Sequence, residues 1–366
     1  MPISEDDIAI LIPTYRYHDK VGRALESALA SGAGEIIVTD DHSRDGTMEL
    51  LASFDDPRLK VFENPQNLGL WENHLVALEH ASRPWVKFIQ ADDYLLPGGL
   101  AAYAAAVEPG VSVVWSCALV KDDETGERMQ FHELANPRRL GGKALLDLCL
   151  HVGWLLGSPS HMMLRADAVT HDPAAWQTEI SADVVIGSIA AAQGDVMLLP
   201  PGAIGQGGHA RQDAKTQGAR RGLRRMIATA TYLAAHPEPA LQRFALLWAR
   251  LNQPIARRSA LSGALRRQIS PVEALRLVLR YRMLTTARDM AWEDRALLKS
   301  ARTYRSLSEH PHDIDRILST FRQCSDPAAV RSEDGAPLLS SNAAGPIRHA
   351  ARHQHPLADT RFPDDA

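Results

Sequence analysis

The stretch Glu35-Ile-Ile-Val-Thr-Asp-Asp41 is an apolar run that ends in two adjacent aspartates, and the pattern returns in Trp85-Val-Lys-Phe-Ile-Gln-Ala-Asp-Asp93. In an open α/β sheet, ligands bind beyond the carboxyl ends of the strands. Oxygen donors placed there suit hard divalent cations such as Mg²⁺ or Mn²⁺. A single doublet is explained equally well by the preference of aspartate for turns and helix N-termini. The repetition favours a shared ligand site.

The residues around these doublets alternate between strand and helix patterns. The apolar run at 8–12 predicts a strand buried on both faces, and residues 20–30 show helical spacing. Further strands are predicted at 35–39, 59–63, 85–90 and 111–116, with helices at 46–54, 71–81 and 98–107. This alternation predicts βαβ units and a mostly parallel sheet. Pro13-Thr-Tyr15 stands where a dinucleotide fold would carry GxGxxG, so that fold is disfavoured.

The second half of the chain changes character twice. The pattern predicts helices at 143–152 and 182–192, strands at 162–164 and 196–199, and a mobile Gly- and Gln-rich loop at 202–218. From 219 to about 321 the strand patterns vanish. Apolar residues there recur at helical spacing, which predicts an all-α extension broken at Pro237, Pro254 and Pro271. Residues 325–366, rich in Pro, Ser, His and Asp, are expected to be disordered.

Composition excludes several classes of protein. The chain has 366 residues and a net charge of −4, which is unlike a nucleic-acid binder. Cys117, Cys149 and Cys324 are too widely spaced for a disulfide framework or a zinc site. The N-terminal residues lack the basic and apolar regions of a signal peptide, and no stretch approaches the roughly 18 apolar residues of a membrane span. We therefore expect a cytoplasmic protein.

Five stretches together resemble the family 2 glycosyltransferases, the inverting nucleotide-sugar enzymes of the GT-A fold. They are Ile10-Leu-Ile-Pro-Thr-Tyr15, Val38-Thr-Asp-Asp-His-Ser-Arg-Asp-Gly-Thr47, Asn67-Leu-Gly-Leu-Trp-Glu-Asn73, Gln90-Ala-Asp-Asp93 and Ser181-Ala-Asp183. The likeness covers about 8–211. It implies a GT-A domain over 1–218, with a nucleotide half at 1–122 and an acceptor half at 123–218. The helical extension at 219–324 lies outside the resemblance.

The resemblance also implies roles for the residues at the strand ends. Asp93 is the expected ligand of Mn²⁺ or Mg²⁺, and Asp92 is expected to hold ribose hydroxyls. Asp41 matches the family carboxylate that accepts a hydrogen bond from the base, commonly uracil N3–H. Tyr15 is expected to pack on that base, with Pro13 and Thr14 shaping the backbone; the alternative for Tyr15 is a simple turn aromatic.

Asp183 stands where the family carries its general base, which would take the proton of the acceptor hydroxyl. The same residue also suits the start of a helix, and both roles can hold together. His209 is a candidate metal or diphosphate ligand and Arg211 a candidate phosphate contact, although a plain surface loop explains His209 equally well. Trp154 and His161 are candidates for the acceptor site, with packing as the alternative.

The sequence thus predicts a metal-dependent inverting glycosyltransferase. Its donor is expected to be a UDP-sugar and its acceptor a hydroxyl of a glycan, a lipid-linked glycan or a peptide. The alternatives are an inactive GT-A scaffold and a sugar nucleotidyltransferase, the latter disfavoured because no glycine-rich phosphate loop follows the first strand. The basic residues Arg220, Arg221, Arg224 and Arg225 form either a peripheral contact with the inner membrane face or a solvated helix face. The helical extension is also a candidate for homo-oligomer contacts.

Overall fold

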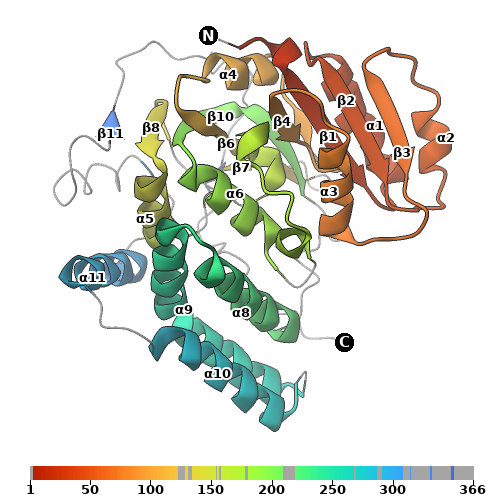
Figure 1. Cartoon of the computed structure of the whole chain (residues 1–366). Helices are drawn as coiled ribbons and strands as arrows, with labels where there is room; N and C mark the ends of the chain where they lie inside the picture. Colours follow the sequence, from red (N-terminus) through yellow and green to blue (C-terminus); the bar gives the residue numbers. More distant parts are fainter. Residues whose placement is uncertain are drawn as a thin grey trace.

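The computed structural model describes residues 3–122, 128–130, 134–153, 155, 158–177, 180–208, 219–267, 269–286 and 291–307, together with residue 314 and the pairs 330–331 and 348–349. Strands and helices alternate through the first part of the chain, and helices alone fill residues 219–307 (Figure 1).

The N-terminal half of the sheet is parallel. It consists of β1 (Ile8–Thr14), β2 (Glu35–Asp40), β3 (Leu59–Glu63) and β4 (Trp85–Phe88). β1 pairs in parallel with both β2 and β4, and β2 pairs in parallel with β3. Every residue of β1, β2 and β4 is buried, and for β1 this confirms the prediction made from its continuous apolar run. The carboxyl ends of these strands consequently lie along one edge of the sheet.

Helices connect these strands and cover the sheet. They are α1 (His18–Leu29), α2 (Thr47–Leu51), α3 (Leu70–Glu79) and α4 (Gly99–Ala105), and a short 3₁₀ turn, η1 (Glu5–Asp7), precedes β1. In α1 the buried residues recur at helical spacing: Val21, Ala24, Leu25 and Ala28.

One strand runs against its neighbours in the centre of the sheet. β9 (Met162–Arg165) pairs antiparallel with β4 on one side and with β6 (Val111–Asp122) on the other. β10 (Asp195–Gly208) then pairs in parallel with β6. The sheet is therefore mixed: the parallel pairing that we predicted holds for β1 to β4 and for β6 with β10, whereas β9 runs antiparallel to both of its neighbours.

Short strands complete the edges of this half of the sheet. They are β5 (Tyr94–Leu95) and β8 (Arg138–Gly141) beside β10, β7 (Arg128–Gln130) beside β6, β11 (Val330–Arg331) beside β8 and β12 (Arg348–His349) beside β7. The pairs in β11 and β12 are the described part of the tail that we expected to be disordered.

The prediction of a loop at 202–218 is wrong for residues 202–208, which belong to β10. Residues Ile204 to Gly208 continue β10 and pair with β6. Gly205 explains how β5 fits beside this strand, because a Cβ at that position would lie 2.5 Å from the ring of Tyr94. The loop prediction relied on glycine content, whereas here glycine permits close strand packing. Residues 209–218 lie outside the described ranges.

The remaining α/β part contains α5 (Gly142–Val152) and α6 (Ala182–Ala192), with 3₁₀ turns η2 (Pro159–His161), η3 (Ala166–Ala168) and η4 (Pro173–Trp176). The helical region consists of α8 (Ala219–Ala235), α9 (Pro239–Leu265), α10 (Pro271–Thr286) and α11 (Trp292–Leu307). Helix boundaries fall near Pro237 and Pro271, as predicted, but Pro254 lies inside α9. Leu251 and Ala256 are buried on either side of it, and their packing outweighs the lost backbone hydrogen bond.

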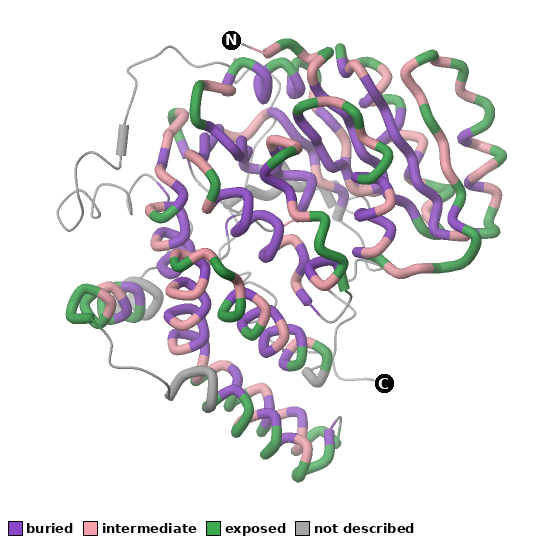
Figure 2. The backbone as a smooth tube through the Cα atoms, viewed as in Figure 1, coloured by how far each residue is buried: buried purple, intermediate pink, exposed green. Residues whose placement is uncertain are grey.

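The helical region packs directly on the α/β part. α8 and α9 contact α6, and α9 and α11 contact α5. Leu223 of α8 and Phe244 of α9 belong to the same hydrophobic cluster as Val185 of α6. Figure 1 shows α8, α9 and α10 below the sheet, and Figure 2 shows that buried residues recur along each of these helices. None of the helices within the described ranges is long and apolar enough to span a bilayer.

Candidate active site

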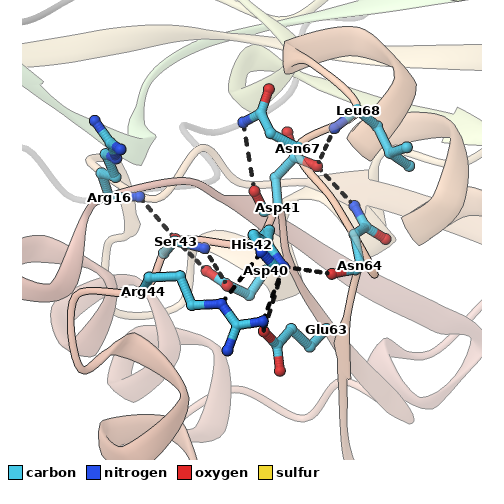
Figure 3. Close-up of polar contacts among 10 residues, drawn as sticks. All are labelled: Arg16, Asp40, Asp41, His42, Ser43, Arg44, Glu63, Asn64, Asn67 and Leu68. Atoms are coloured by element: carbon cyan, nitrogen blue, oxygen red, sulfur yellow. Dashed lines mark hydrogen bonds and ion pairs between the residues drawn. The ribbon is translucent and has the colours of Figure 1, made fainter.

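Asp40 joins the turn after β2 to the turn after β1. Its buried carboxylate accepts hydrogen bonds from the backbone N–H of Ser43, at 2.8 Å, and from the Ser43 hydroxyl. Burial raises the pKa of Asp40, and the bonds from Ser43 oppose that rise. The Ser43 hydroxyl in turn accepts a hydrogen bond from the N–H of Arg16 at 2.8 Å (Figure 3). Asp40 therefore has a structural role at the edge of the site.

Asp41, the next residue, is buried and hydrogen-bonded to the segment before α3 (Figure 3). Its Oδ1 accepts from Asn64 Nδ2 at 2.9 Å and from the N–H of Leu68 at 2.8 Å, and its Oδ2 accepts from the N–H of Gly69 at 2.9 Å. A carboxylate offers about four lone-pair positions. About one position therefore remains for the N–H of a bound base.

Asn73 of α3 bridges the ends of β1 and β2, a role that the sequence analysis missed. Its Nδ2 donates to the carbonyl of Thr39 at 3.0 Å and to that of Thr14 at 3.3 Å. Its Oδ1 accepts from Asn64 Nδ2 at 2.9 Å. Because Asn64 also holds Asp41, this network fixes the position of the Asp41 carboxylate. An asparagine on the apolar face of a helix was the available signal.

Tyr15 lies in the turn after β1, which is hydrogen-bonded to the turn after β2 that contains Asp41. Tyr15 is exposed, and the guanidinium carbon of Arg16 lies 5.1 Å from its ring centroid. Arg16 and His42, with φ of 54° and 62°, are left-handed without being glycine, which is uncommon and recurs at functional turns. Pro13 and Thr14 belong to β1 itself. Among the described residues the buried hydroxyl of Thr14 has no hydrogen-bond partner, so it is an unused polar group at this edge.

Asp93 follows β4 and is buried, whereas Asp92 is less so. Asp93 Oδ1 accepts a hydrogen bond from the N–H of Gly207 in β10 at 3.2 Å. Burial raises the pKa of Asp93 well above its usual range, and the charge of Asp92 raises it further. The Ser160 hydroxyl and the Gly207 N–H hydrogen-bond the carboxylate and oppose this rise. A buried carboxylate whose charge is disfavoured by a neighbouring acid provides a suitable environment for a cation.

Lys87 lies in β4 close to Asp93 and is fully buried. Its Nζ donates to the carbonyls of Phe88, at 3.2 Å, and Ser160, and lies 4.6 Å from the ring centroid of Tyr103. Burial lowers the pKa of Lys87 to about 7, against the attraction of Asp93. From the sequence, Lys87 was predicted only as a strand residue. Because a buried lysine requires compensating partners, its place inside an apolar strand could have drawn attention to it.

The segment Ser158–His161 joins Asp93 to Asp183. The Ser160 hydroxyl hydrogen-bonds the carboxylate of Asp93. At the other end of the segment, the backbone of Ser158 hydrogen-bonds the carboxylate of Asp183. Two acids that are far apart in the sequence therefore lie on either side of one short segment.

Asp183 lies in the first turn of α6 and is partly exposed. Burial raises its pKa, while the N–H of Val184, the charge of Arg225 and the backbone of Ser158 oppose the rise. A carboxylate at a helix N-terminus is stabilised by the unpaired N–H groups there. The helix-start role is thus present, and a raised pKa makes the same carboxylate a better proton acceptor.

Helix α8 reaches the start of α6 from the helical region. Thr229 Oγ1 accepts a hydrogen bond from the N–H of Ser181 at 2.9 Å. Arg225, one turn earlier in α8, is buried and its charge acts on Asp183. The helical region therefore contributes to the surroundings of Asp183, which the sequence did not indicate.

The basic cluster expected at the start of α8 does not form one exposed face. Arg225 is buried, and Arg224 pairs with Glu273 of α10 at 2.5 Å. Arg221 is exposed, and the side chain of Arg220 lies outside what the structure describes. Arg225 leaves the exposed face because α8 turns one side towards α6, and the membrane contact of the other arginines remains a prediction.

His161 is buried, and its ring meets Trp115 edge-on with centroids 6.0 Å apart. Burial lowers the pKa of His161 to about 4, the charge of Lys87 lowers it too, and the Gln206 side chain opposes this. The histidine is therefore neutral near pH 7. Its acceptor role remains a prediction. The candidates Trp154, His209 and Arg211 lie outside the described residues.

A divalent cation fits the acids at the end of β4. In the part of the chain that the structure describes, no group of three or more His, Cys, Asp or Glu side chains could hold a metal ion. Mg²⁺ sites in nucleotide enzymes commonly use one or two carboxylates and complete the octahedron with phosphate oxygens and water. Asp93 would supply such a carboxylate, whereas Asp92 is the residue expected to hold ribose hydroxyls.

Comparisons with known proteins identify relatives of this chain and proteins with a similar fold. Residues 9–171 match the family model described as glycosyl transferase family 2. This range includes Asp41 and Asp93 and ends before Asp183.

Three curated relatives are similar to parts of the chain. An uncharacterized protein of Mycobacterium tuberculosis is 28% identical over 185 residues, which cover 47% of this chain and 57% of the relative. The GalNAc(5)-diNAcBac-PP-undecaprenol beta-1,3-glucosyltransferase of Campylobacter jejuni is 30% identical over 122 residues, 32% of this chain and 39% of the relative. A UDP-Glc:alpha-D-GlcNAc-diphosphoundecaprenol beta-1,3-glucosyltransferase of Escherichia coli is 28% identical over 88 residues, 24% of this chain and 35% of the relative. The chain thus matches little more than half of these relatives at most.

A solved structure resembles almost the whole chain. Residues 1–349 of S. aureus TarS, in complex with UDP-GlcNAc, superpose with a TM-score of 0.58 at 18% identity, covering 86% of this chain and 91% of the other. This likeness confirms the predicted fold. Residues 1–218 are only about three fifths of the 366-residue chain, so a match of 86% extends into the helical region.

Proposed function

We propose that this chain, whose residues 9–171 belong to glycosyl transferase family 2, is a metal-dependent inverting glycosyltransferase that uses a UDP-sugar. The observation that carries the proposal is the segment Ser158–His161, which hydrogen-bonds Asp93 at one end and Asp183 at the other. One acid is thereby available to the donor diphosphate and its cation, and the other to the acceptor hydroxyl.

The donor proposal rests on Asp41 and Tyr15. Asp41 has hydrogen bonds from Asn64, Leu68 and Gly69, and about one lone-pair position left for an imide N–H. Uracil and thymine both offer such a group. The names of the E. coli relative and of the TarS complex specify UDP-sugars, which favours uracil. Tyr15 would stack on the base from the turn after β1.

In the proposed reaction, Asp183 takes the proton of the acceptor hydroxyl as that oxygen attacks the sugar carbon from the face opposite the diphosphate. The buried charge of Arg225 stabilises the Asp183 carboxylate before the proton arrives. The N–H of Gly207 and the hydroxyl of Ser160 orient Asp93. A divalent cation, when bound, neutralises the negative charge that grows on the leaving diphosphate.

For the acceptor, we propose a lipid-linked diphosphate glycan. Two relatives carry names that specify such acceptors, although each matches the chain over a minority of its length. Free glycans and peptides are the alternative acceptors.

The test is release of UDP from UDP-sugars in the presence of Mn²⁺, with and without acceptor. Asp183→Asn is expected to lower the transfer rate by about 10²–10⁴-fold, the usual contribution of a general base. The matched control is Asp167→Asn, because Asp167 is an exposed acid remote from the site. Absence of metal-dependent turnover with any donor would favour the alternative of an inactive scaffold.

Donor choice is tested separately by thermal unfolding with UDP, TDP, GDP and CDP. A nucleotide at a hundred times its dissociation constant stabilises the native state by about 2.7 kcal/mol. We expect the largest shift from UDP with Mn²⁺, and loss of the Mn²⁺ contribution in Asp93→Asn. If UDP with metal shifted nothing, the donor proposal would be wrong.

A further inference from the structure

Helix α10 has apolar residues on two opposite faces. One face is buried against its neighbours, chiefly α9, and consists of Ala274, Leu277 and Tyr281. By the 3.6-residue period the opposite face carries three exposed residues, which we call the α10 stripe: Val272, Leu275 and Leu279. Figure 2 shows buried and exposed residues alternating along this helix. Within the part of the chain that the structure describes, one of the two apolar faces is buried and the other is exposed.

The last turns of α9 also carry exposed leucines. Leu261 and Leu265 are 63% and 76% exposed, and the α10 stripe is 48–60% exposed. α9 and α10 pack against each other as consecutive helices. Soluble proteins rarely leave several large apolar side chains exposed close together unless they meet a partner.

The charge around these residues indicates which partner fits. Between residues 255 and 282 the sequence contains seven arginines and one acid, Glu273. All seven arginines are exposed: Arg257, Arg258, Arg266, Arg267, Arg276, Arg280 and Arg282. The acid already pairs with Arg224 of α8. Arg276 and Arg280 directly follow the two leucines of the α10 stripe, so positive charge flanks the apolar face.

We propose that the exposed face of α10 docks on an anionic lipid bilayer. The α10 stripe would enter the boundary between head groups and acyl chains, and the flanking arginines would meet the lipid phosphates. Two copies of the chain placed face to face here would bring two strongly basic surfaces together, which disfavours self-association through this face. The surface differs from the basic cluster of α8, whose members face different directions.

Helix α11 supplies a matched contrast. Trp292 is 70% exposed, but Glu293 and Asp294 follow it directly. An anionic surface would repel these acids. Arg295 and Arg302 of α11 are exposed as well and lie outside the proposed face. Changes at Trp292, Arg295 and Arg302 therefore control for the loss of apolar area and of charge in general.

The experiment is co-sedimentation of the full chain with vesicles of phosphatidylcholine alone or mixed with phosphatidylglycerol. We expect binding to the anionic vesicles at least tenfold stronger than to neutral ones, weakening from 0.1 to 0.5 M NaCl. Leu275→Ser with Leu279→Ser, and Arg276→Glu with Arg280→Glu, are each expected to lower binding at least tenfold, since each arginine contributes about fivefold near such a surface. Trp292→Ser, and Arg295→Glu with Arg302→Glu, should stay within twofold of wild type.

Equal binding to both vesicle types, or unchanged binding by the leucine pair, would overturn the proposal. So would size-exclusion evidence that the wild type self-associates through Leu275 and Leu279 and leaves the vesicles unbound. Circular dichroism confirms that each variant is folded. The readout is binding rather than turnover, so its outcome is independent of the proposed transferase activity.

Discussion

The N–H of Ser181, at the start of α6, donates a hydrogen bond of 2.9 Å to the hydroxyl of Thr229 in the middle of α8. Thr229 is fully buried. Asp183 lies two residues after Ser181, in the first turn of α6. The position of the proposed base therefore depends on a residue from the helical region.

Thr229→Val keeps the shape of the side chain but removes the acceptor. Losing one buried hydrogen bond of about 1–1.5 kcal/mol at the start of α6 is expected to lower kcat roughly tenfold. KM for the donor should change little, because the proposed donor contacts are at the ends of β1, β2 and β4. Steady-state kinetics of Thr229→Val beside Thr229→Ser, which retains the hydroxyl, checks this. Equal losses in kcat and in donor affinity would argue for general unfolding instead.

Asn73→Leu is expected to destabilise the protein by about 2–4 kcal/mol. The substitution removes the donor to the carbonyls of Thr39 and Thr14 and leaves buried polar groups without partners, at about 1–3 kcal/mol each. Urea unfolding measures the loss. Asn67→Ala is the control, since Asn67 is exposed and its hydrogen bond to the Asp41 carbonyl is long, at 3.4 Å. A loss for Asn73→Leu no larger than for the control would contradict the bridging role.

Asp183→Asn is expected to raise stability at neutral pH although it lowers activity. Burial raises the pKa of Asp183, so between the ordinary value of 3.8 and the raised value the folded state binds more protons than the unfolded state. The free energy of unfolding therefore falls as pH rises through this window, and the penalty is complete above it. A gain of about 0.5–2 kcal/mol is typical for such a replacement. In thermal unfolding, the melting temperature of Asp183→Asn should exceed that of the wild type by a margin that is large at pH 7.5 and small near pH 4. A difference in melting temperature that grows towards acid pH would refute the prediction.

Lys87→Met is expected to change how the stability of the protein depends on pH above neutrality. Folded Lys87 loses its proton near pH 7 instead of 10.5, so between these values the unfolded state binds more protons. Wild-type stability should therefore rise with pH relative to Lys87→Met, by at most about 1.4 kcal/mol per pH unit. Melting temperatures at pH 7 and 9 measure the difference. Lys299→Met, at an exposed lysine of α11, should show no such trend.

Local patterns were sufficient to predict the parallel strands and the acids that follow them. β1, β2 and β4 are short, largely apolar segments bounded by turn residues, so their ends place Asp41 and Asp93 without knowledge of the rest of the fold. The strand Leu59–Glu63 and the helix Ala182–Ala192 were predicted with their observed bounds.

Features that depend on distant packing could not be predicted. Ser158–His161 reaches Asp93 only because β9 inserts beside β4, and no local pattern encodes that pairing. Arg225 appeared in the sequence as one of several surface arginines, and its burial follows from the side of α8 that meets α6. Pro254 stays helical for the same reason, because burial on both sides outweighs its local preference.

The central position of β9 has a consequence for synthesis of the chain. β9 fills the space between β4 and β6, yet it is translated after both of them. Until residue 165 has left the ribosome, each of these older strands has an open flank that could recruit a strand from another nascent polypeptide. Truncated products that stop before Met162 should therefore accumulate as insoluble aggregates, whereas products that extend through β10 can fill both flanks of β6.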